Sequence, residues 1–177
     1  MGSEMCIRDR VKITNYRTLR KIDLQLGSAL NIIVGDNETG KSTLLEAINL
    51  ALTCQLNRRN AQYELHPFLI NTDAVADFIA DHRSGNATPP PKLIIELFFE
   101  DEDSLADMKG TNNSEGENVP GIKLHIELSP SRYAEFSAYV SDPSKLNSIP
   151  IEYYDVCLLY TSPSPRDATL SRMPSSA

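Results

Sequence analysis

The most informative stretch of the sequence is residues 35–43, which read GDNETGKST. It fits the pattern G-x-x-x-x-G-K-[ST], with Gly35, Gly40, Lys41 and Ser42 at the defining positions. Glycines allow backbone conformations and close approaches that a Cβ atom forbids, so successive N–H groups can point at one anion. A lysine adds a compact positive charge, and a serine hydroxyl is a suitable ligand for magnesium. These residue types at this spacing predict a loop that binds the phosphates of a nucleotide.

Each loop residue has an expected contact. Lys41 is predicted to reach the β- and γ-phosphates, Ser42 to bind the Mg²⁺ ion that bridges them, and Thr43 to approach the α-phosphate. A helix that begins at Lys41 points its positive end at the same anion. The cofactors predicted are therefore ATP and Mg²⁺. The other predicted nucleotide contacts in the loop are Gly35, Asn37, Glu38, Thr39 and Gly40.

Such a loop needs a strand before it and a helix after it. Residues 30–34 (LNIIV) form a short apolar run rich in β-branched residues, which predicts a buried strand. The run STLLEAINLAL after Lys41 lacks Gly and Pro and repeats apolar residues at helical spacing. Upstream, residues 11–16 and 22–26 alternate with period two, which predicts a hairpin. The expected fold class is α/β: an incomplete P-loop NTPase lobe with a mixed sheet, an N-terminal hairpin, and the P-loop strand and helix.

Further elements are expected downstream of the first helix. Periodicity and capping residues predict helices over residues 73–82 and 132–140, and a helical turn over 104–109. Apolar runs predict strands over residues 92–99, 122–128 and 151–155, and the Asn-rich stretch 110–121 predicts a surface loop.

Three other patterns resemble functional motifs and are interpreted otherwise. Residues 94–101 (IIELFFED) resemble a strand that ends in a magnesium-binding acidic pair, but Glu96 interrupts the apolar run and Asp101 follows Glu100 instead of preceding a glutamate. We interpret them as a strand leading into an acid-rich helix start. Residues 107–110 (DMKG) fit the D-x-x-G of GTPases, but no N-K-x-D follows to select guanine. The scattered histidines His66, His82 and His125 lack metal-ligand spacing and are interpreted as surface or packing residues.

The two ends of the chain are related through the genetic code. One coding of residues 157–162 (CLLYTS) has a reverse complement that encodes MCIRD in a shifted frame, and residues 5–10 read MCIRDR. That DNA resembles the inverted end of a transposase-type sequencing adapter. We therefore expect residues 1–10 and 157–177 to be artefactual flanks, residues 11–156 to be the natural segment, and the natural protein to continue past Val156.

Composition limits what the 11–156 segment can do. Its 146 residues suit about one domain. It holds 13 Lys and Arg against 21 Asp and Glu, a net charge of −8, which argues against a broad nucleic-acid surface within it. Cys54 has no cysteine partner inside the segment, and no apolar run is long enough to cross a bilayer. A soluble, cytoplasmic protein without a membrane contact is expected.

The order of these motifs resembles a known superfamily. A strand with N-Y-R, a second strand and then LNIIVGDNETGKSTLLEAI are similar to the ABC-type ATPase heads of the RecF and structural-maintenance-of-chromosomes superfamily. Asn37 and the run from Leu44 to Ile48 most resemble the overcoming-lysogenisation-defect (OLD) family of ATP-dependent endonucleases. Asp36 and Glu38 depart from the Pro and Gly that are commoner in the superfamily. The resemblance is strong over residues 11–52 and faint beyond.

The resemblance implies a role for residues outside the loop and for a larger protein. Arg17 would match a strand-one arginine that approaches the nucleotide. It implies a head-to-head homodimer that acts on DNA, with ATP hydrolysis controlling cleavage by a nuclease domain. The alternatives are a RecF-like nucleotide-switched DNA clamp in DNA repair, or an incomplete lobe that is inactive alone. No residue of the segment is assigned a catalytic role, and an acidic nuclease domain or long heptad repeats downstream would separate the first two readings.

Overall fold

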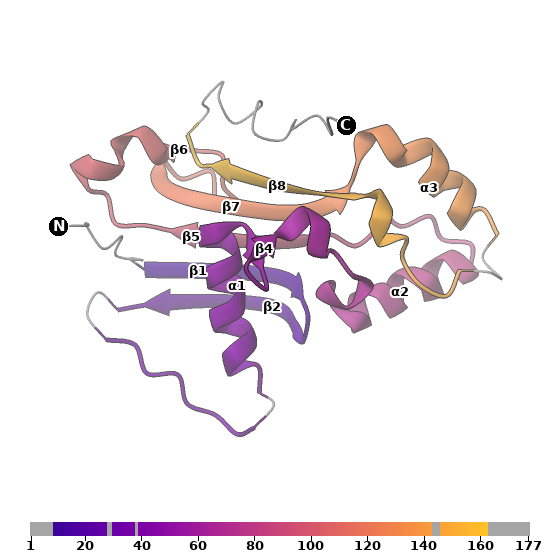
Figure 1. Ribbon diagram of the computed structural model, residues 1–177, viewed down its shortest axis with the longest axis horizontal. Coiled ribbons are helices and arrows are strands. Elements are labelled where there is room, and N and C mark those ends of the chain that lie inside the picture. The colour runs from indigo at the N-terminus through magenta and orange to yellow at the C-terminus, as the bar shows by residue number, and fades with distance from the viewer. Residues whose placement is uncertain (1–8, 28–29, 38, 143–145, 163–177) are drawn as a thin grey trace.

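The computed structural model describes residues 9–27, 30–37, 39–142 and 146–162 of the 177-residue chain. Its centre is a sheet with strand order β2-β1-β5-β7-β6, in which β7 also pairs with β8 (Figure 1). Every strand pair within the described residues is antiparallel. The strands are β1 (Asp9–Tyr16), β2 (Leu19–Leu26), β5 (Leu93–Phe98), β6 (Lys109–Gly110), β7 (Val119–Leu128) and β8 (Tyr154–Tyr160).

The predicted N-terminal hairpin is confirmed, with longer strands than the alternation indicated. β1 and β2 pair around a turn of two residues, Arg17 and Thr18, because Tyr16 is the partner of Leu19. Arg17 has a positive φ of 47°, as two-residue hairpin turns require. The hairpin therefore places Arg17 at one end of the sheet, with β2 as the edge strand.

One face of the sheet is apolar and carries the first helix. Ile13, Ile95 and Leu124 are neighbours across β1, β5 and β7, and all three are fully buried. The helix α1 (Lys41–Thr53) contacts these three strands and crosses the sheet in Figure 1. Helix α1 packs through apolar residues spaced three or four apart, which form one stripe. The buried residues of that stripe are Leu44, Ala47, Leu50 and Ala51.

The opposite face carries a row of charges. Lys12, Glu96 and Lys123 are cross-strand neighbours there. The Glu96 carboxylate is buried, lies 3.5 Å from Lys123 Nζ and accepts a hydrogen bond of 2.8 Å from the Ser114 backbone N–H. Lys12 forms an ion pair with Glu115, so the loop before β7 is fixed over this row. The charge that interrupts the apolar run of β5 is thus a paired structural residue.

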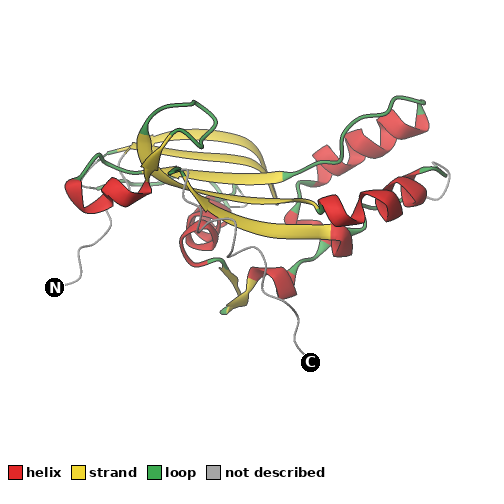
Figure 2. Ribbon diagram, turned by 90° about the horizontal axis from the view of Figure 1, so that it is seen from above, coloured by secondary structure: helices red, strands yellow, loops and turns green. Residues whose placement is uncertain are grey.

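Shorter elements and two further helices complete the fold. Helices α2 and α3 lie together beyond one end of the sheet (Figure 2), and the Phe78 and Phe136 rings that join them have centroids 6.1 Å apart. Both helices were expected, and both are present within a residue of the expected bounds. The remaining elements are β3 (Gln55–Leu56), β4 (Arg59–Asn60), η1 (Ala61–Glu64), η2 (Pro67–Leu69), α2 (Thr72–Arg83), η3 (Asp103–Met108), η4 (Pro130–Arg132), α3 (Tyr133–Val140) and η5 (Ile151–Tyr153).

The strand predicted before the loop is not formed. Residues 30–34 have no regular secondary structure, and Leu30, Ile32 and Val34 are at least three-quarters exposed. An isolated apolar run becomes a strand only when neighbouring strands satisfy its backbone groups, and no described strand pairs with it. The α/β fold class is confirmed, but the prediction of a strand over residues 30–34 is wrong.

Two other predicted strands differ from the structure. The run expected over residues 122–128 begins earlier, at Val119, and is more buried than a half-exposed strand. The last strand begins at Tyr154, because Ile151–Tyr153 is a 3₁₀ turn that follows Pro150. Proline fixes φ near −65°, which suits a tight turn better than a strand interior.

Strand β8 runs through the predicted boundary between natural sequence and flank. It continues past Val156 to Tyr160, and the Thr161 hydroxyl donates to the Met108 carbonyl. Strand pairing depends on backbone hydrogen bonds that any residue except proline can make. The pairing is therefore compatible with either origin of residues 157–160, and the three-part division at residues 10 and 156 stays a prediction.

Sequencing the source locus again tests this division directly. Because the two ends share one inverted DNA sequence, we expect the natural coding sequence to diverge from this chain between Arg10 and Val11 and at or just after Asp155. The measurement is an amplicon or transcript that spans each junction. A native transcript that reads continuously through CLLYTSPSPRD would refute the assignment.

Candidate nucleotide-binding site

The glycine loop ends at a glycine that the packing requires. Gly40 has φ 88° and ψ 13°, a left-handed conformation that glycine adopts without strain. A Cβ atom there would lie 2.9 Å from Leu19 Cδ2 and 3.4 Å from Thr18 Oγ1. The Gly40 carbonyl accepts the first helical hydrogen bond, from the Leu44 N–H at 2.8 Å. This glycine thus lets the loop turn into α1 while it contacts the β1–β2 turn.

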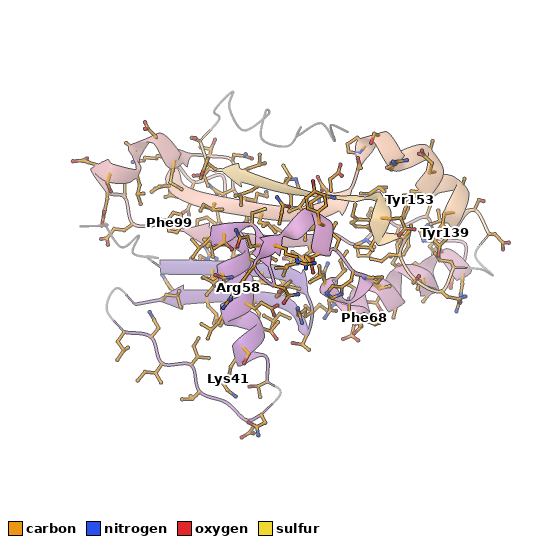
Figure 3. All side chains as sticks on the ribbon, viewed as in Figure 1. Lys41, Arg58, Phe68, Phe99, Tyr139 and Tyr153 are labelled. Carbon is orange, nitrogen blue, oxygen red and sulfur yellow. The ribbon has the colours of Figure 1, made fainter. Side chains whose placement is uncertain are left out.

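The Lys41 ammonium group is held by its own loop. Lys41 Nζ donates to the Gly35 carbonyl at 2.6 Å and to the Asp36 carbonyl. The Thr39 hydroxyl lies 3.4 Å from Nζ and itself donates to the Asp36 carbonyl at 2.9 Å. Figure 3 shows Lys41 at the end of α1 that extends beyond the edge strand β2. The charge stands at the mouth of the loop, and an arriving phosphate can replace the neutral carbonyls with charged acceptors.

The first turn of α1 is suited to an anion. Within the described residues, no side chain caps its N-terminus and its first turn has no acidic residue. The backbone N–H groups of Lys41, Ser42 and Thr43 therefore remain available to donate hydrogen bonds to an anion. Ser42 is exposed and Thr43 is half-buried, both on this turn. Gly40 to Thr43 thus lie at the uncapped start of α1, and their contacts with phosphate stay a prediction.

Three other loop residues were predicted to contact the nucleotide. Asn37 is exposed, and Gly35 lies against Thr39, where a Cβ atom would be 2.8 Å from Thr39 Oγ1. The prediction for Glu38 falls on a residue outside those that the structure describes. A side chain at position 35 would therefore require the Thr39 hydroxyl to move.

An apolar cavity of about 270 Å³ lies beside the loop. Apolar residues of β2, of the run before the loop and of α1 line one part of it, and the loop residues Gly35, Thr39, Gly40 and Lys41 line the other. The cavity thus adjoins the residues that the motif assigns to phosphate binding.

Arg17 lies at the neighbouring turn but is paired with a residue that sequence reasoning missed. Arg17 Nη2 is 2.7 Å from Glu46 Oε1, and the guanidinium carbon is 5.7 Å from the centroid of the Tyr16 ring. The turn is fixed by the Arg17 N–H donating to the Leu69 carbonyl and the Asn71 amide donating to the Arg17 carbonyl. Glu46 is the only acidic residue of α1, and that isolation was the signal available in the sequence.

The tyrosine under this ion pair is strongly perturbed. Burial and, to a lesser degree, the nearby Glu46 carboxylate raise the pKa of Tyr16 to about 12, against the opposing effect of the Arg17 guanidinium. The hydroxyl therefore stays protonated throughout the physiological range and can act as a donor. It is fully buried, on the first strand of the hairpin.

The acidic stretch after β5 lies elsewhere. Asp101 forms an ion pair with Lys109, and η3 begins two residues later, so the interpretation as a strand leading into an acid-rich helix start is confirmed. In Figure 1 the segment 103–108 lies beyond the left end of the sheet, whereas α1 begins below the edge strand β2. Within the described residues, no group of three or more His, Cys, Asp or Glu could hold a metal ion. None of the described helices is long and apolar enough to cross a membrane.

Comparison with known proteins gives independent evidence for the family of this chain. The sequence profile of the AAA domain family matches residues 10–153. The chain is 43% identical over 51 residues to the DNA replication and repair protein RecF of Magnetococcus marinus, covering 29% of this chain and 13% of that protein. It is 46% identical over 44 residues to the DNA double-strand break repair Rad50 ATPase of Methanopyrus kandleri, covering 25% of this chain and 5% of that protein.

Other similar proteins also match over only part of their length. RecF of Haemophilus ducreyi is 54% identical over 39 residues, which cover 22% of this chain and 11% of that protein. The matched part spans no more than about a fifth of the length of these curated relatives. A solved structure from work on ATP-driven dimerization and DNA-stimulated activation of SMC ATPases superposes with a TM-score of 0.42 and 17% identity, covering 67% of this chain and 62% of that one.

Proposed function

Because this chain belongs to the AAA domain family, as part of an ATPase head of the RecF and SMC kind, we propose that it binds Mg²⁺-ATP at residues 35–43. The observation that carries the proposal is the junction of loop and helix. Gly40, in the left-handed conformation, turns the chain into α1, whose first turn is uncapped, and Lys41 Nζ lies 2.6 Å from the Gly35 carbonyl of the same loop. An uncapped helix start and a lysine ammonium group in one short loop favour a polyphosphate.

Within that proposal each residue has one task. Lys41 contacts the β- and γ-phosphates, Thr43 the α-phosphate, and Ser42 contributes its hydroxyl to the Mg²⁺ shell. Backbone groups of Gly35, Asn37, Thr39 and Gly40 would contact the phosphates from the loop side, and the contact predicted for Glu38 falls on a residue outside those that the structure describes. Arg17 is the further nucleotide contact. The magnesium ion would neutralise phosphate charge, and these residues position it.

The activity of the whole protein is a second level of the proposal. We propose an ATP-dependent DNA-processing enzyme, specifically an OLD-like endonuclease in which ATP hydrolysis controls DNA cleavage and two heads associate as a homodimer in the cytoplasm. The character of the GDNETGKST loop supports this reading. The RecF and Rad50 similarities equally support a nuclease-free, nucleotide-switched DNA clamp. The sequence beyond Val156 separates them, through a metal-binding nuclease domain or through long heptads.

The chain itself is expected to bind Mg²⁺-ATP weakly and saturably and to release no phosphate. Its loop supplies binding groups, whereas the two described carboxylates considered for catalysis and positioning are engaged elsewhere, Asp101 with Lys109 and Glu46 with Arg17. Calorimetric titration with Mg²⁺-ATP measures the binding, and a phosphate-release assay at high protein concentration measures the turnover. Lys41→Ala is the blank for both. Phosphate release above that blank would give Asp101 or its acidic neighbours a catalytic role.

A further inference from the structure

The strongest unexplained cluster is Tyr16, Arg17 and Glu46, at the contact between the hairpin and α1. Arg17 and Glu46 form the 2.7 Å ion pair, and both side chains are about one-third exposed. Tyr16 is fully buried directly beneath the guanidinium. Tyr16 ends β1, Arg17 lies in the β1–β2 turn, and Glu46 lies on α1, the helix that follows the glycine loop.

Two polar atoms of this cluster have no hydrogen-bond partner within the described residues. They are the Tyr16 hydroxyl oxygen and Arg17 Nε, and both are buried. Buried polar atoms are almost always paired, because losing water without a replacement is unfavourable. The Glu46 carboxylate lies near enough to the Tyr16 hydroxyl to raise its pKa, so a small movement of the carboxylate would let it accept a hydrogen bond from Tyr16.

The position of the ion pair connects it to the loop. Thr18 and Leu19, which follow Arg17 in the chain, are the residues closest to Gly40. Glu46 lies on the helix that begins with Lys41. Arg17 is therefore a second cation beside the phosphate loop, and it is held there by a carboxylate. The Arg17–Glu46 ion pair is partly exposed, so it contributes little free energy. A polyphosphate bound at Lys41 carries more negative charge than Glu46 and competes with it for the Arg17 guanidinium.

We propose that Glu46 is a positioning residue that holds Arg17 in a resting position, and that bound nucleotide phosphate displaces Glu46 from the guanidinium. The Tyr16 hydroxyl then donates to the released Glu46 carboxylate, so neither group is left unpaired. This exchange makes nucleotide affinity depend on a residue that does not touch the nucleotide. It rests on the proposed binding of Mg²⁺-ATP at residues 35–43.

The test is the affinity of the 177-residue chain for Mg²⁺-ATP in a set of variants. Glu46→Gln removes the competing charge and is expected to tighten binding about three- to tenfold. The same substitution in an Arg17→Ala background is expected to change nothing, because the released cation is missing. Tyr16→Phe is expected to weaken binding about two- to fivefold, because displaced Glu46 then lacks its donor.

Controls separate this role from a structural one. Glu64→Gln removes an ion-pair carboxylate elsewhere, the partner of Arg59 at 3.2 Å, and should leave affinity unchanged. Thermal unfolding without nucleotide checks that each variant folds. A purely structural clamp predicts equal or weaker binding for Glu46→Gln, so only tighter binding supports the exchange.

The outcomes also separate this inference from the binding proposal. Binding that depends on Lys41 but is unchanged or weakened in Glu46→Gln overturns the exchange alone. Tighter binding that persists in the Arg17→Ala background overturns it too, as does unchanged affinity in Tyr16→Phe. Absence of saturable binding in the unsubstituted chain overturns both proposals.

Discussion

Replacing Lys41 with alanine is expected to weaken Mg²⁺-ATP binding by roughly ten- to a hundredfold, because a charge-assisted hydrogen bond contributes about 1.5 to 3 kcal/mol. The ammonium group already stands at the loop mouth, where it donates to the Gly35 and Asp36 carbonyls. The variant loses the charge while Gly40 and the helix end keep their geometry. Calorimetric titration of both proteins at one ionic strength measures the difference.

A second lysine provides the matched control. Lys92 is more than half exposed and lies 3.7 Å from Glu127, so Lys92→Ala removes the same charge away from the loop. It should bind Mg²⁺-ATP as the unsubstituted chain does. Equal affinities for the Lys41 and Lys92 variants, both folded, would contradict the phosphate role of Lys41.

Replacing Leu50 with alanine is expected to lower the free energy of unfolding by about 2 to 5 kcal/mol. Leu50 is fully buried where α1 packs on the sheet, so the substitution removes apolar burial and leaves a cavity. Urea denaturation followed by circular dichroism measures the change, provided that the slope with urea stays constant.

The same helix offers the same substitution at an exposed position. Leu45 is 58% exposed, so Leu45→Ala should change the unfolding free energy by only about 0.5 kcal/mol. Similar losses for both variants would mean that α1 does not pack on the sheet through its Leu44 to Ala51 stripe.

Local pattern was sufficient for the parts of the fold that depend on local physics. The hairpin follows from alternation around Ile13 and Ile22, and α1 follows from apolar spacing after Lys41. The glycine loop could be found because each defining residue type has a steric or electrostatic reason. Gly40 is the clearest case, since both its φ and the proximity of Leu19 require it.

Features that depend on distant partners could not be predicted from the sequence. Residues 30–34 have the composition of a buried strand, but composition does not say whether neighbouring strands are present. The pairing of Glu46 with Arg17 joins residues 29 positions apart, and only the packing of α1 beside the hairpin turn brings them together. The burial of Glu96 likewise depends on Lys123 and on the loop that covers them.

The exposed run from Leu30 to Val34 has a consequence for the physical behaviour of the chain in solution. Its residues are uncharged and mostly β-branched, and Ile32 and Val34 are 75% and 83% exposed. Short segments of this composition nucleate intermolecular cross-β assembly, and the nearby β2 is an edge strand that can extend such an assembly. The net charge of −7 opposes association of the chain as a whole, but it is not located on this segment. We therefore expect these five residues to lower the highest protein concentration at which the chain stays dispersed.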